Sequence, residues 1–219
     1  PGRRTLEAAD SGSGGRLRFV LDRPEDLSQR MVRVPGGRYA PRVPLMIVLR
    51  PVEMGDFLID TYEVTNREFK EFVDKGGYAD ATYWKHSFAG SGRVLSWKDA
   101  LALFKDRTGR PGPSNWELGG YAKGQDDYPV GGISWFEAAA YAEYSGKSLP
   151  TLYHWVVSAG LGNASSIIPM SNFQGKGPAP GGRFDSLGPF GTYDMAGNVR
   201  EWCWNASGDM RYIMGGDWD

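Results

Sequence analysis

The sequence YPVGGISWFE, residues 128–137, places a short apolar run directly before the start of a helix. Ser134 stands three residues ahead of Glu137, the spacing at which each side chain can accept a hydrogen bond from the other residue's backbone amide. The alanine-rich segment that follows continues through Tyr144 to Gly146, and glycine commonly ends a helix. The sequence therefore predicts a buried apolar segment that leads into a capped helix.

The rest of the chain carries similar start and stop signals for short elements. Thr65 and Glu68 form a second capping box. In all, helices are predicted from Thr65 to Gly76, from Ser96 to Asp106, from Ser134 to Gly146 and from Thr151 to Gly160. Strands are predicted over residues 16–22, 57–60, 199–204 and 212–214, and over 31–37 as a strand running into a turn. Residues 161–190 are rich in Gly, Pro and Ser and are expected to be irregular.

The composition is that of a globular domain with many loops. Its 219 residues include 31 Gly, 14 Pro and 8 Trp, so large aromatic side chains are expected to pack numerous turns. The formal net charge of -1 gives no reason to expect nucleic acid as a partner. The longest apolar run, residues 43–49, is too short to cross a bilayer, so no membrane contact by this chain itself is expected.

The chain divides into a leading segment and one main domain. Residues 1–29 are interpreted as a mobile Gly/Ser-rich stretch to Gly15, a strand over 16–22 and a linker over 24–29. That strand is either the last strand of a preceding domain or an edge strand of the main domain. Residues 30–219 are predicted to form the main domain, truncated at its C-terminus, within a larger protein.

Six segments occur in an order that matches one known family. They are MVRVPGG (31–37), YEVTN (62–66), YPVGGISW (128–135), GKSLPT with Trp155 (146–155), YDMAGNVREW (193–202) and MGGDW (214–218). On these segments the chain resembles the formylglycine-generating enzyme, or sulfatase-modifying factor, family. The resemblance implies an α+β fold of the elaborated C-type lectin-like kind. Short helices, a small antiparallel sheet and much irregular loop are expected in such a fold.

The resemblance also implies a chemistry that this chain does not reproduce. The family's oxidases bind copper with two thiolates, which are soft ligands suited to copper(I). Their cysteines would follow Trp218, whereas the only cysteine here is Cys203, which reads as a small buried residue between two tryptophans. The family's serine and aromatic residue are replaced by Asp217 and Arg200, which we expect to pair with each other. No catalytic residue is assigned, copper is not expected, and His86 and His154 are interpreted as packing or surface residues.

Calcium is the metal that the resemblance favours. It implies a structural Ca²⁺ held by the carboxylates of Asp194 and Glu201 and the backbone carbonyls of Gly197 and Val199, a set of hard oxygens that suits the ion. The alternative is that Asp194 and Asn198 only cap a turn, while Glu201 binds a backbone group or Arg200. A second family site would use Asn172 and the carbonyl of Phe173, but its acidic partner loop is missing between Gly177 and Gly182.

Three functions follow from these observations. The first is a non-catalytic binding or sensory module in a larger bacterial protein, of the kind fused to Ser/Thr kinases. Such a module would be extracytoplasmic, and it would bind a protein or peptide at a face around Trp84, Trp116 and Trp218. The second is a copper-dependent formylglycine-generating oxidase cut before its cysteines. The third is a lectin-like domain for ligand display.

Overall fold

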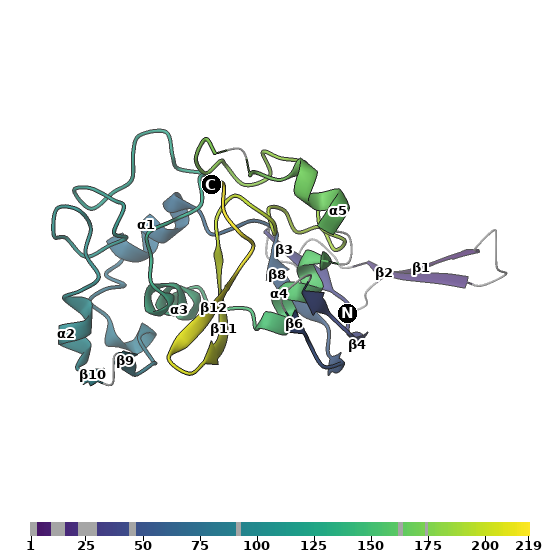
Figure 1. The fold of residues 1–219 in the computed structure, drawn as a ribbon, viewed down its shortest axis with the longest axis horizontal. Coiled ribbons are helices and arrows are strands. Elements are labelled where there is room, and N and C mark those ends of the chain that lie inside the picture. The colour runs from purple at the N-terminus through teal and green to yellow at the C-terminus, as the bar shows by residue number, and fades with distance from the viewer. Residues whose placement is uncertain are drawn as a thin grey trace.

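The computed structural model describes residues 4–9, 16–21, 30–43, 47–90, 93–161, 164–173 and 175–219. Short helices, two-stranded antiparallel sheets and long ordered loops make up these parts of the chain (Figure 1). The α+β fold with much irregular loop is confirmed. Over the described ranges, no helix combines the length and the apolar character that a membrane span requires.

The predicted helix starts are confirmed. Thr65 and Glu68 form the reciprocal pair at the start of α1, because the Thr65 amide donates to Glu68 Oε2 at 2.8 Å. Ser134 and Glu137 do the same for α3, at 2.7 Å. The helices are α1 (Asn66–Asp74), α2 (Trp97–Leu101), α3 (Trp135–Tyr144), α4 (Leu152–Ala159) and α5 (Ala164–Ile167), with single 3-10 turns at η2 (Ala81–Tyr83) and η4 (Ile168–Met170).

Helix α4 has an unusual cap. Thr151 Oγ1 accepts from the His154 amide and also lies 2.6 Å from His154 Nδ1. The imidazole therefore occupies the place that an acidic side chain has in a capping box. At the other end, Gly160 adopts a φ of 60° against Pro189. A Cβ at this glycine would lie 2.4 Å from the proline ring, so both the backbone angle and the packing favour glycine.

Two helix predictions need correction. The helix that begins after Ser96 ends at Leu101 and does not reach Asp106. The Asp106 side chain accepts hydrogen bonds within the loop that follows the helix. Residues 161–190 are not wholly irregular, since α5 and η4 lie within them. Pro169 stands in the first positions of η4, where its missing amide costs no helical hydrogen bond.

The strands form six antiparallel pairs within the described part of the chain. The pairs are β1 (Arg4–Ala9) with β2 (Arg16–Leu21), β3 (Met31–Val34) with β8 (Phe57–Asp60), β4 (Gly37–Tyr39) with β7 (Val52–Met54), β5 (Arg42–Val43) with β6 (Ile47–Val48), β9 (Phe88–Gly90) with β10 (Arg93–Leu95), and β11 (Glu201–Ser207) with β12 (Met210–Met214). The predicted strands at 16–22, 31–37 and 57–60 are confirmed. Those at 199–204 and 212–214 are confirmed with shifted ends.

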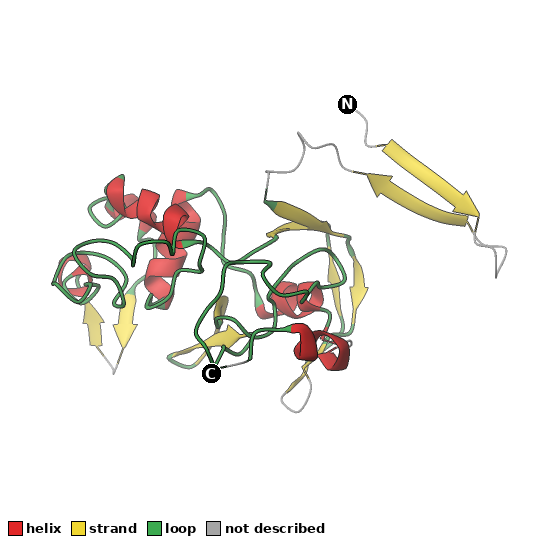
Figure 2. Ribbon diagram, turned by 90° about the horizontal axis from the view of Figure 1, so that it is seen from above, coloured by secondary structure: helices red, strands yellow, loops and turns green. Residues whose placement is uncertain are grey.

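The leading segment contains one strand that was not predicted. Residues 4–9, expected to be mobile, form β1, which pairs with β2 over six residues. Leu6 and Ala8 alternate with charged or polar residues. Such alternation is typical of a strand that pairs with a neighbouring strand. Figure 2 shows this hairpin at one end of the molecule. The linker predicted over 24–29 lies outside the described residues.

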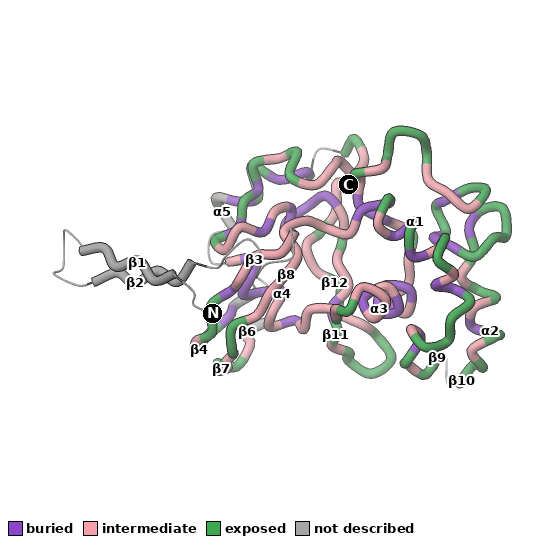
Figure 3. The backbone as a smooth tube through the Cα atoms, turned by 180° about the vertical axis from the view of Figure 1, so that it is seen from behind, coloured by how far each residue is buried: buried purple, intermediate pink, exposed green. Residues whose placement is uncertain are grey.

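Two apolar clusters hold the main body together. The first packs α1, α2 and α3 around aromatic side chains such as Phe69, Phe72 and Trp116. The second packs α4 against β11 through Trp155 and Cys203. The β11–β12 hairpin lies between the elements of the first cluster and those of the second (Figure 1). Figure 3 shows buried backbone, in purple, on both sides of this hairpin. Trp202 joins the hairpin to the first group, because its Nε1 donates to the Ile133 carbonyl at 3.1 Å.

Asp106 anchors the loop that follows α2. Its Oδ1 accepts from the Thr108 amide and hydroxyl, both at 2.8 Å, and from the Arg110 amide at 3.0 Å; its Oδ2 accepts from the Gly119 amide at 2.7 Å. Burial alone would raise the pKa of the Asp106 carboxyl. The hydrogen bonds from these donors lower the pKa by a larger amount, so that it is about 2. The charged carboxylate thus fixes a loop that carries the buried Trp116.

Replacing Asp106 with Ala is expected to lower the free energy of unfolding by about 1–2 kcal/mol, because several charge-assisted hydrogen bonds are lost at once. The native pKa is depressed, so this contribution is present above the ordinary pKa of 3.8 and is lost as the pH falls towards 2. Urea denaturation at neutral and acid pH measures both effects. Asp127→Ala, at an exposed ion pair with Arg67, is the control and should change stability little.

Candidate metal centre

The loop between Asp194 and Glu201 is held in a tight and unusual backbone conformation. Asp194 and Asn198 have φ values of 56° and 59°, and Gly197 has 77°. Asp and Asn adopt this left-handed region more easily than other residues with side chains. Asp194 is buried, and its two carboxylate oxygens accept from the Gly182 amide at 2.7 Å and the Ser186 hydroxyl at 2.8 Å. Asp194 therefore joins this loop to the segment from Gly182 to Ser186.

Asn198 ties this loop to three other segments. Its Nδ2 donates to Glu63 Oε1 at 2.9 Å and to the Ala179 carbonyl at 3.2 Å. Its Oδ1 accepts from Asn172 Nδ2 at 3.0 Å and from the Ala179 amide at 2.8 Å. Every polar atom of this buried amide is thus used within the protein. Asn198 is a structural residue, and it brings Glu63 to the loop.

The carboxyl groups of Glu63, Asp194 and Glu201 interact electrostatically at this loop. Glu201 Oε2 accepts from Trp155 Nε1 at 2.8 Å. Burial raises the pKa of Glu201 to about 7, and the neighbouring Asp194 raises it too, against the lowering effect of Trp155. The pKa of Glu63 is also raised well above its ordinary value, first by burial and then by Glu201 and Asp194. Buried carboxyl groups that raise one another's pKa are stabilised by bound protons or by a cation.

Glu63 supplies the observation that most favours a cation. Its Oε2 is buried and has no hydrogen-bond partner in the described part of the chain, although a buried carboxylate oxygen normally has one. Residue type alone could not reveal this role, because Glu63 stands in YEVTN, just ahead of the α1 cap. Only the fold brings it to Asn198, 135 positions later in the sequence.

The carboxyl groups alone do not make a metal site. Taken over the described ranges, no group of three His, Cys, Asp or Glu side chains is arranged to hold a metal ion. A calcium ion here would therefore need carbonyls as well, as the predicted set with Gly197 and Val199 provides. Carboxylate and carbonyl oxygens are the kinds of donor that calcium takes, and calcium binding by this loop stays a prediction.

The residues of the second predicted site lie against the first loop. Asn172 is buried, its carbonyl accepts from the Asn198 amide at 2.9 Å, and its Nδ2 donates to the Gly177 carbonyl at 3.1 Å. The Phe173 ring covers Gly197 and Gly216, where a Cβ would lie within 3.1 Å of it. Asn172 thus braces the loop with its amide, and a separate second calcium site stays a prediction.

Arg200 and Asp217 form the expected ion pair, with Arg200 Nη2 3.0 Å from Asp217 Oδ2. The two residues that depart from the family pattern have therefore become partners. We expect Arg200→Asp and Asp217→Arg each to lower the melting temperature slightly. The double swap should restore it, because exposed pairs contribute about 0.2–1 kcal/mol. Differential scanning fluorimetry of the three variants measures this coupling, and a double swap as unstable as the sum of the singles would contradict it.

Cys203 is fully buried in the second apolar cluster, as predicted. Burial raises the pKa of its thiol to about 12, and the charge of Glu201 adds to the effect. The thiolate that copper or a disulfide partner needs is therefore strongly disfavoured. His86 packs between Trp135 and Trp204, and His154 packs against Phe57, so the predicted packing role of both histidines is confirmed.

The predicted aromatic binding face is wrong for two of its three residues. Trp84 and Trp116 are only 8% and 1% exposed, because both belong to the first apolar cluster. Trp84 Nε1 donates to the Gly77 carbonyl and Trp116 Nε1 to Asn66 Oδ1, so their polar atoms are satisfied inside the core. The number of tryptophans in the sequence does not indicate which of them lie in the core and which lie on the surface.

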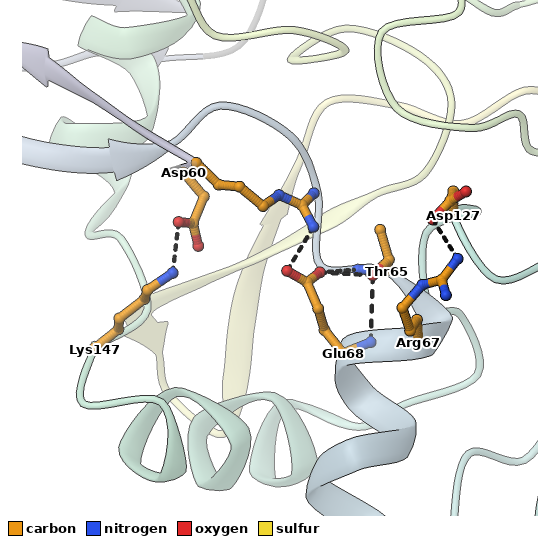
Figure 4. A network of polar contacts seen from close by, with 7 residues as sticks. Asp60, Thr65, Arg67, Glu68, Asp127 and Lys147 are labelled. Carbon is orange, nitrogen blue, oxygen red and sulfur yellow. Dashed lines mark hydrogen bonds and ion pairs between the residues drawn. The ribbon is translucent and has the colours of Figure 1, made fainter. Parts of the chain in front are cut away.

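A hollow of about 790 Å³ lies beside the metal loop. Its wall includes β8, α3, the turn before α4 and the β11–β12 hairpin, and Glu63, Arg200, Glu201, Asp217 and Trp218 contribute to it. On this wall, Lys147 Nζ lies 2.6 Å from Asp60 Oδ1 (Figure 4).

Fold and site together define a class of protein. The chain matches the family described as "Sulfatase-modifying factor enzyme 1-like domain" over residues 20–219, and it belongs to that family. The solved structure titled "Treponema denticola variable protein 1" shares the fold, with a TM-score of 0.52 and 16% identity over 100% of this chain and 88% of that one.

Similar proteins carry different functional names. The "Formylglycine-generating enzyme" of Thermomonospora curvata is 30% identical over 84% of this chain and 74% of its own. The "Inactive C-alpha-formylglycine-generating enzyme 2" of Bos taurus is 28% identical over 86% of this chain and 76% of its own. The "Serine/threonine-protein kinase pkn1" of Chlamydia pneumoniae is 29% identical over 83% of this chain, which spans 28% of the kinase.

Proposed function

We propose that this chain is a non-catalytic formylglycine-generating-enzyme-like domain, which acts as a binding or sensory module in a larger protein. The observation that carries the proposal is the state of its single cysteine. Cys203 is buried and holds its proton, so the residues present do not fit copper, which needs two neighbouring thiolates. The names of two relatives, one inactive enzyme and one kinase, support a role outside oxidation.

The proposed module contains one structural Ca²⁺, held by Asp194, Glu201 and the carbonyls of Gly197 and Val199. The buried Oε2 of Glu63 supports this assignment, because a cation would give it the partner that it lacks in the described part of the chain. Calcium here would stabilise the domain and carry no reaction. The number of Ca²⁺ ions bound per chain tests the second predicted calcium site, at Asn172 and Phe173, because that site would bind a second ion.

The proposed ligand is a protein or peptide. With Trp84 and Trp116 in the core, exposed apolar side chains remain on the β11–β12 hairpin, where Trp204 is 39% and Met210 73% exposed. Aromatic and methionine side chains are enriched at protein interfaces. These exposed side chains support a protein or peptide as the class of ligand.

A peptide oxidation assay tests the proposal against the enzyme alternative. The purified chain is incubated with copper(I), oxygen and a peptide that carries a sulfatase-type cysteine motif. We expect no aldehyde to form, as measured by mass spectrometry, because only one thiol is present and it is buried. Copper-dependent conversion, lost in Cys203→Ala, would overturn the proposed function.

The oxidase alternative has support from the relative in Thermomonospora curvata, whose name is that of the active enzyme. Sequencing the gene beyond the codon for Asp219 separates the two functions. A cysteine shortly after Trp218, with another a few residues later, would favour an oxidase. Their absence would favour the binding module.

A further inference from the structure

One arginine of the β11–β12 hairpin is held in place without an acidic partner. The guanidinium carbon of Arg211 lies 3.7 Å from the centre of the Trp135 ring, and its Nη1 donates to the Trp204 carbonyl at 3.0 Å. Among the described residues no carboxylate forms an ion pair with Arg211, not even that of Asp209 two positions earlier. A guanidinium has five N–H donors, so most of those of Arg211 are free to bind another molecule.

The rings around Arg211 are fixed by their own contacts. Trp135 is 3% exposed, and its Nε1 donates to the Cys203 carbonyl at 2.9 Å. The His86 ring packs edge-on against Trp135 and Trp204, with centroid distances of 5.0 and 4.9 Å. A cation on the face of a tryptophan ring is attracted by the ring's electrons. Because Arg211 is already ordered, a ligand that bound it would cost little further side-chain entropy.

Exposed apolar side chains accompany this cation on the hairpin. Met210 precedes Arg211 in the chain, and Trp204 accepts its hydrogen bond; both side chains are exposed. The turn that joins β11 to β12 is exposed as well (Figure 3). Tryptophan, methionine and arginine are enriched at protein interfaces, and tryptophan and arginine carry much of the binding energy there. The hairpin thus presents one unpaired charge within an apolar surface.

The balance of charge around the hairpin favours an acidic ligand. Lys85 and Glu143 both act electrostatically on His86, and they form an ion pair with each other. Their charges therefore offset, whereas the charge of Arg211 has no such partner in the described part of the chain. A carboxylate can accept two parallel hydrogen bonds from one guanidinium. The net charge of -1 makes nucleic acid or an anionic membrane a poor alternative.

We propose that the β11–β12 hairpin binds an acidic peptide segment, in which an Asp or Glu carboxylate pairs with Arg211 and an adjacent apolar side chain covers Trp204. The inference rests on the proposed binding function and names the chemistry of its ligand. Arg211 sets the specificity, while Trp204 and Met210 supply apolar contact area. A basic peptide is rejected, because it would place a like charge against an unpaired arginine.

Selection from a phage-displayed library of short random peptides tests the proposal. We expect the enriched peptides to carry Asp or Glu beside a large apolar residue. A synthetic copy with an amidated C-terminus is then titrated with the purified chain, and fluorescence anisotropy measures its affinity. Arg211→Gln should weaken binding about tenfold or more. Replacing the acidic residue of the peptide with the matching amide should cause a similar loss, and the two losses should not add, because they remove the same contact.

Two further variants define what is lost. Arg211→Lys keeps the charge but not the planar pair of donors, so its affinity should lie between those of the wild type and Arg211→Gln. Arg67→Gln, at the exposed pair with Asp127 on α1, is the control and should leave the affinity unchanged.

The outcomes separate this inference from the proposed function. Selected peptides without acidic residues, or an affinity that Arg211→Gln leaves unchanged, would overturn the inference and leave a peptide-binding module. A selection that yields no binder would contradict both. The substitution in the peptide changes nothing in the protein, so a folding defect in a variant leaves the test intact.

Discussion

Millimolar Ca²⁺ is expected to raise the melting temperature of the domain by about 5–10 °C near neutral pH. A ligand present at a hundred times its dissociation constant stabilises a fold by about 2.7 kcal/mol. For a domain of this size, each kcal/mol shifts the melting temperature by about 2–4 °C. The physical cause is the neutralisation of the carboxyl groups of Glu63, Asp194 and Glu201, because burial raises the pKa of each and so disfavours its charge.

The pH dependence of this effect has a definite sign. Burial, aided by Asp194, raises the native pKa of Glu201 from 4.5 to about 7. The stabilising contribution of its bound proton is therefore full below 4.5 and is lost as the pH rises through 7. Calcium needs the deprotonated form, so the calcium-induced shift should be small near pH 5 and largest above pH 7.

Differential scanning fluorimetry with and without Ca²⁺, repeated for Glu201→Gln, measures both effects. The glutamine can still accept from Trp155 Nε1, but it lacks the charge that calcium requires. We expect the variant to lose most of the calcium-induced shift. Glu71→Gln, which alters only an exposed pair with Lys75, should retain the shift in full. A shift of equal size in both variants would place calcium elsewhere.

Trp155→Ala is expected to lower the free energy of unfolding by about 3–5 kcal/mol, the largest single effect foreseen. Trp155 is 1% exposed at the centre of the second apolar cluster, and deleting a buried ring leaves a cavity. The substitution also removes the one donor that lowers the pKa of Glu201. Urea denaturation of the variant measures the loss.

Two further substitutions separate packing from hydrogen bonding at this position. Trp155→Phe keeps most of the buried surface but removes the Nε1 donor, so it should cost less than the alanine variant while weakening the calcium site. Trp204→Ala, at a ring that is 39% exposed, should cost less than half as much as Trp155→Ala. A Trp155→Ala variant no less stable than Trp204→Ala would contradict the assigned core.

The elements that could be predicted from the sequence are those encoded locally. The capping boxes at Thr65 and Ser134 place α1 and α3 because cap chemistry depends on residues three positions apart. Helix α2 was predicted too long, because Asp106 is held by partners as distant as Gly119. Strand β1 was missed, since its regular structure depends on pairing with β2.

In the candidate metal centre too, some contacts could be predicted from the sequence and others could not. The Arg200–Asp217 pair could be inferred, because two departures from one family pattern called for a common explanation. Glu63 could not be inferred, since only the folded chain brings it to Asn198. The exposure of Trp84 and Trp116 was misjudged for a related reason. A tryptophan in a loop-rich sequence packs wherever the loops enclose it, and both rings are enclosed by the first cluster.

Calorimetric titration of one protein sample, first with Ca²⁺ and then with copper(I), tests the central claim most directly. That claim is that this fold has the oxygen donors for calcium and lacks an accessible pair of thiolates for copper. We predict saturable binding of one Ca²⁺ and no tight binding of copper(I). Tight copper(I) binding without a calcium signal would contradict it.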